Sequence, residues 1–318
     1  MTVTPSSLEP QPTGLTTRMR ASLRRCLAEA QPCQRFLHRV AAIFAASAVV
    51  HAVVFVADDR PWGGPASWRQ PLAFSFAFTL VVSSLAWVMT FLPRRRRLGW
   101  AVSGTLGVAA LGTVVLIAAQ AWRQQPAFFP EDLPLDNTLW TGIQIGIGLI
   151  VAAIVVEAVW AMTPLQAPPS IRWAIRAGLV LVVAGLAMGG VMVAEGVTQD
   201  LDNEEPGQVS SPIVFGEAGL VLLPHLLALH GLLVLSALAW LLSFTGWPLR
   251  RRTTTVQLAA AGYLAMVAVS LAQALAGRAP LDLPGLFAVL FWSSVALVSG
   301  TVAATLGGLA NTARQPAG

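Results

Sequence analysis

The sequence carries little charge. Only 11% of its 318 residues are Asp, Glu, Lys or Arg, whereas soluble domains carry about 25% charged residues. This shortage excludes a water-soluble globular protein. Lysine is absent, so all 20 basic residues are arginine. Cysteine is confined to Cys26 and Cys33, which we expect to stay reduced, either as plain thiols or as a weak metal or redox pair.

The sequence also lacks the short motifs of common enzyme classes. It contains no G-x-S-x-G turn, no Walker loop, no H-E-x-x-H zinc motif and no Asp-rich diphosphate motif. These absences leave open whether the protein is an enzyme, and no residue is predicted to be catalytic.

Long apolar segments fill most of the chain, which is 55% hydrophobic. A helix that crosses a bilayer needs roughly 20 apolar residues. We therefore predict an all-α integral membrane protein with eight transmembrane helices. They are expected at residues 39–57, 71–92, 99–121, 139–162, 174–196, 218–245, 254–276 and 284–310.

The arginines are distributed unevenly between the two sides of these spans. Sixteen of the 20 fall on the side that holds both termini, and such an excess is typical of the cytoplasmic face. We expect a bacterial inner-membrane protein with both termini inside. The sequence pI of 10.8 then reflects topology, not a nucleic-acid partner. In the Arg-rich tail, residues 1–38, we expect a disordered start and an amphipathic helix at 17–38 lying on anionic lipid.

Two spans resemble each other without a gap. The segment from Pro71 and the segment from Pro224 share an S-x-LAW core, and the same offset carries Gln120 onto Gln273. With a second offset, VFVAD in the first span meets VMVAE in the fifth. We predict a parallel four-plus-four duplication that forms two four-helix bundles, from halves at 39–163 and 164–318. The alternative is chance similarity between apolar runs.

Three histidines fall within the outer half of the spans: His51, His225 and His230. Polar residues at membrane depth are candidates for function. In one interpretation His51 and His225 share a cavity and bind a heme iron or a transition metal, with His230 as a secondary or alternative ligand. In the other, each histidine only fastens helices together through a hydrogen bond to a carbonyl.

Other polar residues collect near the outer helix ends. Arg69 and Arg123 each follow a tryptophan and either clamp an anionic group or pair with acids such as Asp58 and Asp136. The remaining polar candidates are Gln70, Gln120, Gln144, Gln273 and Glu157. Glu157 is the one acid expected to be buried in a span, near its cytoplasmic end, and is either a proton-relay group or an interfacial side chain reaching water or Arg172.

Three strings carry a resemblance to a known family. They are SWRQPLAFSFAFTL (Ser67–Leu80), QAWRQQPAFF (Gln120–Phe129) followed by PLD (Pro134–Asp136), and HLLALHGLLVLSALAWLL (His225–Leu242). Together they resemble a family of uncharacterised bacterial polytopic, eight-span membrane proteins of unassigned function, whose patterns run close to SWRKP-x-x-FG, Q-x-x-RG-x-x-SHFN-x-x-TPFD and H-x-x-x-x-HALQ. The resemblance implies no chemistry. Phe128 stands where that pattern has the histidine of SHF, which removes a metal ligand from the loop.

The predicted architecture is also similar to that of heme A synthase, which has eight spans in two four-helix halves. That family carries its histidine ligands in pairs on the second and fourth helices of each half. Here the second, fourth and eighth spans contain no histidine, so the likeness does not extend to the ligands.

These observations lead to three functional expectations. The first is a protein with an outward-facing polar cavity that binds a heme or metal cofactor in a redox role, ligated by His51 and His225, with Arg69 and Arg123 at its mouth. The second is a carrier for a small or lipophilic solute. The third is a non-catalytic membrane assembly partner. The lipid bilayer is the expected environment, and the small-molecule or protein partner is unidentified.

Overall fold

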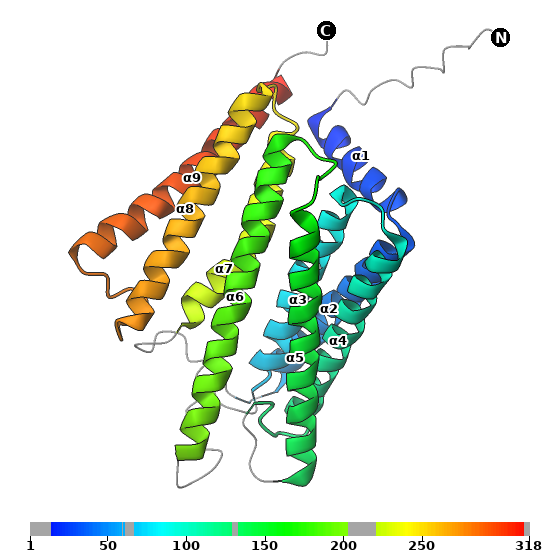
Figure 1. The fold of residues 1–318 in the computed structure, drawn as a ribbon, viewed down its shortest axis with the longest axis vertical. Helices are drawn as coiled ribbons and strands as arrows, with labels where there is room; N and C mark the ends of the chain where they lie inside the picture. Colours follow the sequence, from blue (N-terminus) through cyan, green and yellow to red (C-terminus); the bar gives the residue numbers. More distant parts are fainter. Residues whose placement is uncertain (1–13, 59, 61–66, 129–132, 203–220, 315–318) are drawn as a thin grey trace, which may run out of the picture.

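The protein is all-α. A computed structural model describes residues 14–58, 60, 67–128, 133–202 and 221–314, which form nine α-helices and one short 3-10 helix (Figure 1). The α-helices are α1 (Leu15–Ala28), α2 (Pro32–Ala57), α3 (Arg69–Val88), α4 (Arg96–Trp122), α5 (Pro134–Ala161), α6 (Pro169–Asp202), α7 (Leu222–Leu242), α8 (Leu249–Leu275) and α9 (Gly285–Arg314), and the 3-10 helix η1 (Met89–Phe91) follows α3.

Eight of these helices, α2 to α9, are long and apolar enough to cross a membrane. This finding confirms the number of candidate spans. Several helices start earlier than expected, with α2 at Pro32, α5 at Pro134 and α6 at Pro169. Proline favours the first turn because its φ suits a helix and its missing N–H is not needed there. Residues 32–38 therefore belong to α2. Residues 1–13 and 218–220 of the expected segments lie outside the described residues.

The long helices pack as two groups of four. In the first group α2 packs on α3, α4 packs on α5, and α4 also contacts α2 and α3. The second group has the same arrangement, with α6 on α7, α8 on α9, and α8 against α6 and α7. The groups meet where α3 contacts α7 and α5 contacts α6. Figure 1 shows α6 and α7 between the first group and the pair α8 and α9. One core of buried aliphatic side chains continues through both groups.

The bundle has two distinct ends. The start of α1 and the end of α9 lie at one end, called here the terminal end, and α2, α4 and α8 finish at the other, the distal end (Figure 1). The helix α1 lies at the terminal end, where the indole N–H of Trp240 on α7 donates to the hydroxyl of Ser22 across 3.3 Å.

The repeated sequence strings fall on helices with matching bounds. The helix α7 begins 153 residues after α3, and α8 begins and ends 153 residues after α4. Beyond both ends lies a residue with positive φ, Gln124 at 59° and Gly277 at 68°. The next amide donates back to the carbonyl of Gln120 or Gln273, over 2.9 and 3.2 Å. Both helices thus end in the same left-handed cap, which satisfies a free carbonyl of the last turn.

Candidate functional site

His51 lies toward the distal end of α2 and is buried, with 5% of its surface exposed. Its Nδ1–H donates to the backbone carbonyl of Ser47, 2.8 Å away. The Ser47 hydroxyl in turn bonds to the Ser75 hydroxyl of α3 over 2.9 Å. In the neutral imidazole, a proton on Nδ1 leaves a lone pair on Nε2. Nε2 is buried without a partner among the described residues, so His51 presents a free acceptor inside this helix pair.

A hydrogen-bonded cluster at the distal end of the same helix pair consists of Asp58, Arg60 and Trp68, and we call it the closure. The Trp68 indole N–H donates to Asp58 Oδ2 over 2.7 Å, and Arg60 Nε donates to the same oxygen over 2.9 Å. The Arg60 guanidinium also lies 3.8 Å over the Trp68 ring. The hydrogen bond from Trp68, reinforced by Arg60, lowers the pKa of Asp58. The ring centroids of His51 and Trp68 are 6.1 Å apart, so this closure is adjacent to His51.

Arg69 is the first residue of α3, directly after Trp68. One of its guanidinium nitrogens, Nη2, is buried without a hydrogen-bond partner. None of the three ion pairs within the described ranges includes Arg69. Its charge is therefore not compensated by a paired carboxylate in that part of the chain.

The register of α2 against α3 brings the predicted residues to one place. Ser47 meets Ser75, and Asp58 meets Trp68, so the two helices run antiparallel. His51, between Ser47 and Asp58, then lies beside the first turn of α3. That turn holds Arg69 and the buried Gln70. We call His51, Arg69 and Gln70 the distal site.

A second polar cluster, on α4 and α5, borders the distal site. Arg123 donates to the side chains of Gln120 and Asp136, and the Gln120 amide donates to Asp136 over 3.2 Å. Gln120 and Asp136 are both buried. Arg123 thus pairs with an acid, one of the two alternatives open from the sequence. Arg60 Nη1 donates to the Ala121 carbonyl over 2.9 Å and links this cluster to the closure at Asp58.

His225 bonds within the other helix group. Its Nδ1–H donates to the Gly185 carbonyl of α6 over 2.7 Å, and a β-carbon on Gly189 would lie 2.8 Å from the ring. The hydrogen bonds of His51 and His225 thus lie on different helix pairs, and no contact joins the two rings. The described residues also contain no group of three or more His, Cys, Asp or Glu placed to hold a metal. Shared ligation by these histidines stays a prediction.

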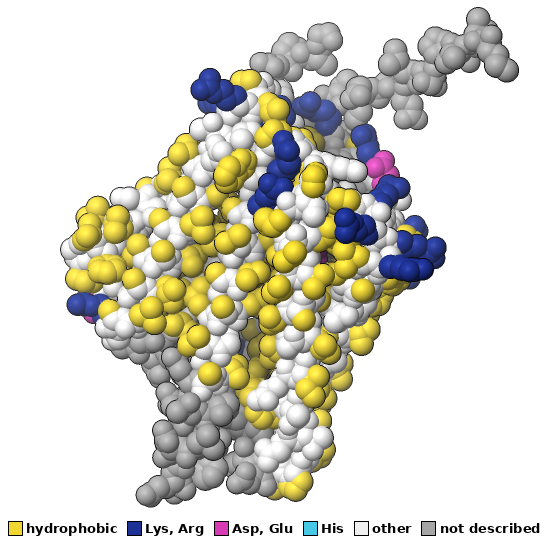
Figure 2. Space-filling model, viewed as in Figure 1, with side chains coloured by type: hydrophobic (Ala, Val, Ile, Leu, Met, Phe, Trp, Pro, Cys, Tyr) yellow, Lys and Arg dark blue, Asp and Glu magenta, His cyan; other side chains and the backbone are white. Residues whose placement is uncertain are grey.

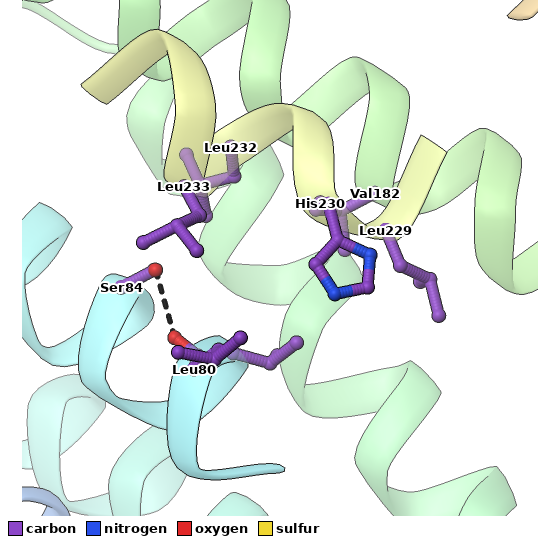
Figure 3. A pocket seen from close by; sticks show the side chains of 8 residues that line it. Leu80, Ser84, Val182, Leu229, His230, Leu232 and Leu233 are labelled. Carbon is purple, nitrogen blue, oxygen red and sulfur yellow. Dashed lines mark hydrogen bonds between the residues drawn. The ribbon is translucent and has the colours of Figure 1, made fainter. Parts of the chain in front are cut away.

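His230 borders a small pocket where α3, α6 and α7 meet (Figure 3). The pocket is lined by Leu80, Val81, Ser84, Val182, Leu229, His230, Leu232 and Leu233. Its volume of about 10 Å³ has room for roughly one water molecule. His230 Nδ1–H donates to the Leu226 carbonyl over 2.7 Å, and Ser84 donates to the Leu80 carbonyl over 2.8 Å. The polar groups here are largely satisfied by their own helices.

The other predicted polar residues lie apart from the distal site. Gln144 is on an exposed face of α5. Gln273 is buried on α8, where its amide donates to the Asp282 carbonyl. Glu157 is fully buried in α5 near the terminal end.

Sequence reasoning missed the residues that hold His51 in place. Ser47 fixes its Nδ1, while Ser75 and Trp68 of α3 pack beside it. A signal for Ser47 existed, because it precedes His51 by four residues and so shares its helix face.

Known proteins add no constraint on this site. No family model, curated protein or solved structure matches the chain. The resemblance carried by Ser67–Leu80, Gln120–Phe129 and His225–Leu242 therefore stays a prediction.

Proposed function

We propose that the protein is a membrane carrier for a small oxyacid, a solute with a hydroxyl donor beside an oxyanion, such as a hydroxycarboxylate or hydrogen phosphate. The proposal rests on two buried nitrogens without partners, Nε2 of His51 and Nη2 of Arg69. Leaving a buried polar group unpaired costs about 1–3 kcal/mol. An oxyacid satisfies both groups, because its hydroxyl donates to Nε2 and its oxyanion accepts from the guanidinium.

The charges around the distal site favour an anionic solute. Arg60 and Arg123 are each paired, with Asp58 and Asp136. Arg69 has no such pair within the described ranges. The net charge left for a ligand is therefore positive. Gln70, in the same turn of α3, offers an amide that both donates and accepts hydrogen bonds.

The experiment measures thermal unfolding of the purified full-length protein in detergent with lactate or inorganic phosphate. We expect at least one of these to raise the midpoint, and His51→Gln and Arg69→Gln to abolish the rise. His230→Gln and Arg278→Gln are matched controls that should keep it, since His230 lies at another pocket and Arg278 is exposed. No rise in the wild type, or an equal loss in the controls, contradicts the proposal.

A heme or metal cofactor in a redox role is the second candidate. An imidazole that donates Nδ1–H to a carbonyl and keeps a free Nε2 has the arrangement of a metal-ligating histidine. His51 would supply the ligand, and Arg69 and Arg123 would face anionic groups of the cofactor. Visible absorption and metal analysis of the purified protein separate this candidate from the carrier, because a Soret band or bound metal lost in His51→Gln supports it.

The membrane assignment of the carrier is the bacterial inner membrane, with both termini cytoplasmic. Eight long apolar helices support a multi-pass protein. Figure 2 shows arginine side chains gathered toward the terminal end, the distribution typical of a cytoplasmic face. A membrane-impermeant maleimide is expected to label Cys26, which lies in α1 at that end, only after cells are opened. Labelling in intact cells contradicts this orientation.

The helix α1 is proposed to rest on anionic lipid at the cytoplasmic surface. It carries four arginines and exposes Leu23 and Leu27, which are 52% and 54% exposed. Basic and apolar groups on one surface helix are typical of interfacial binding. The same basic surface is the one that a membrane assembly partner would contact.

A parallel duplication of four helices is the proposed origin of this fold. Matching helix bounds and matching left-handed caps support it. A T-shaped aromatic pair, Trp87 and Phe91 at 4.8 Å, recurs 153 residues later as Trp240 and Phe244 at 4.9 Å. The repeated helices α3 and α7 also contact each other, as expected for elements beside a pseudo-twofold axis along the membrane normal.

A further inference from the structure

Glu157 is a buried acid that the distal site does not use. It lies four residues before α5 ends at Ala161, and its side chain is 0% exposed. Neither carboxyl oxygen has a hydrogen-bond partner, and no ion pair within the described ranges includes it. The indole nitrogen of Trp160, three residues later, is also buried without a partner. Unpaired polar atoms at such depth in a membrane helix point to a function.

The buried face of α5 that carries Glu157 packs against α4. Gly146 of α5 meets Thr113 of α4, and a β-carbon on Gly99 of α4 would lie 4.0 Å from the Trp160 ring. Glu157 lies between these two contacts along α5, within the same buried stripe. We therefore expect the carboxyl to lie on the α4 side of α5, near the terminal end of the bundle and at the opposite end from the distal site.

Arg176 of α6 is a cation held at the end of α5. Its guanidinium donates to the last backbone carbonyls of α5 and the turn after it, those of Ala161, Met162 and Thr163, over 3.2–3.3 Å. It is thus held about one helical turn beyond Glu157 without pairing with it. Toward the terminal end, the neighbouring helices also carry Cys33 of α2, Arg96 and Arg97 of α4, and Arg172 of α6. Cys33 is buried, and these three arginines are exposed.

We propose that Glu157 is a proton-binding site that pairs with Arg176 once its proton has left for the aqueous phase at the terminal end. A lone carboxylate in a low-dielectric interior is strongly disfavoured, whereas the neutral acid is tolerated there. The guanidinium is able to donate a two-pronged hydrogen bond to an ionised carboxylate. Only the O–H bond breaks, the proton passes to water, and the electron pair stays on the carboxylate.

The test uses dicyclohexylcarbodiimide, an apolar reagent that dissolves in bilayers and reacts with neutral carboxylic acids. The acid proton moves to a carbodiimide nitrogen, and the carboxyl oxygen adds to the central carbon. Transfer of the acyl group to nitrogen then leaves a stable adduct, with no leaving group. Full-length protein in lipid vesicles is treated over a range of pH, and the modified peptides are mapped by mass spectrometry.

We expect an adduct on Glu157 that is absent from Glu157→Gln and that declines as pH rises. Arg176→Gln should move the midpoint of this decline upward by about one pH unit, because the ionised form loses its partner. Arg172→Gln is the matched control, since Arg172 is one turn away on α6 and exposed. It should leave the midpoint unchanged.

Three outcomes overturn the proposal. They are no adduct on Glu157 while a water-soluble carbodiimide labels the exposed Asp282, an adduct yield that does not vary with pH, and equal midpoints in the wild type and Arg176→Gln. If Glu157→Gln fails to fold, the wild-type peptide map still decides the matter. Solute binding at the distal site is independent of this result, so Glu157→Gln should keep the oxyacid-dependent rise in thermal stability.

Discussion

The two halves share a helix arrangement but differ at their distal ends. The first half carries Ser47, His51, Arg69, Gln70, Ser75 and Arg123, where the offsets of the proposed repeat give Ala184, Met188, Leu222, Leu223, Ala228 and Ala276 in the second. The second half folds with the same helix contacts and without these polar groups. Apolar side chains therefore suffice for the arrangement, and the polar set of the first half is where we propose that a ligand binds.

The largest predicted contrast between the halves concerns Arg123 and Arg278. Arg123→Gln leaves Asp136 buried and without its ion pair, at 1% exposed, and should lower the free energy of unfolding by about 3 kcal/mol. Arg278 and Asp282 are exposed and 3.8 Å apart, so Arg278→Gln should cost less than about 0.5 kcal/mol. Denaturant unfolding in mixed micelles measures both. Equal losses of unfolding free energy in the two variants would contradict this prediction.

The second prediction exchanges residues between the halves. His51→Met removes a buried unpaired nitrogen and should leave stability unchanged or raise it by about 1 kcal/mol, while solute binding is lost. Met188→His buries an imidazole in the apolar second half and should cost about 1–3 kcal/mol. Unfolding and solute-dependent thermal shifts are measured together. If His51→Met destabilises as much as Met188→His, His51 fastens helices and binds nothing.

The third prediction uses the matching helix caps. Gln124 has φ of 59°, which strains a side chain, whereas Gly277 has φ of 68° without that strain. Gln124→Gly should raise stability by about 1 kcal/mol, and Gly277→Gln should lower it by about the same amount. Unfolding midpoints of the two variants test this. A stability change of the same sign in both variants would show that the two helix caps are not equivalent.

The fourth prediction concerns pH and the closure at Asp58, and it has the smallest expected effect. The pKa of Asp58 is lowered by Trp68 and Arg60, so its stabilising contribution is present above the ordinary pKa of 3.8 and is lost as pH falls through the lowered value. The difference in unfolding midpoint between the wild type and Asp58→Asn should hold above this pH and vanish below it. A difference that grows in acid contradicts this assignment.

Much of the fold follows from the sequence, because a bilayer span leaves a long apolar signature. The spans and their number come directly from hydropathy. Helix starts were misjudged at Pro32, Pro134 and Pro169, since polar first turns hide the beginning of an apolar helix.

The site was harder to predict than the fold. Depth along a helix places His51 and His225 at similar levels, but their partners depend on the rotation of each helix about its axis. That rotation turns His51 toward Ser47 and Trp68, and His225 toward Gly185 of α6. Because a span is apolar on all of its faces, its sequence contains little information about this rotation. The contact of Arg123 with Asp136 was foreseen as an alternative because charges at a helix mouth have few partners.

Nitrogen NMR of the full-length protein in lipid bilayers, with ¹⁵N-labelled histidine, tests the central claim most directly. The chain has four histidines, and His51→Gln assigns one signal. The carrier proposal predicts that an oxyacid shifts the Nε2 resonance of His51 while His230 stays unchanged. If His51 remains unaffected at saturating lactate and inorganic phosphate, or if His230 alone responds, the distal site is not where the solute binds.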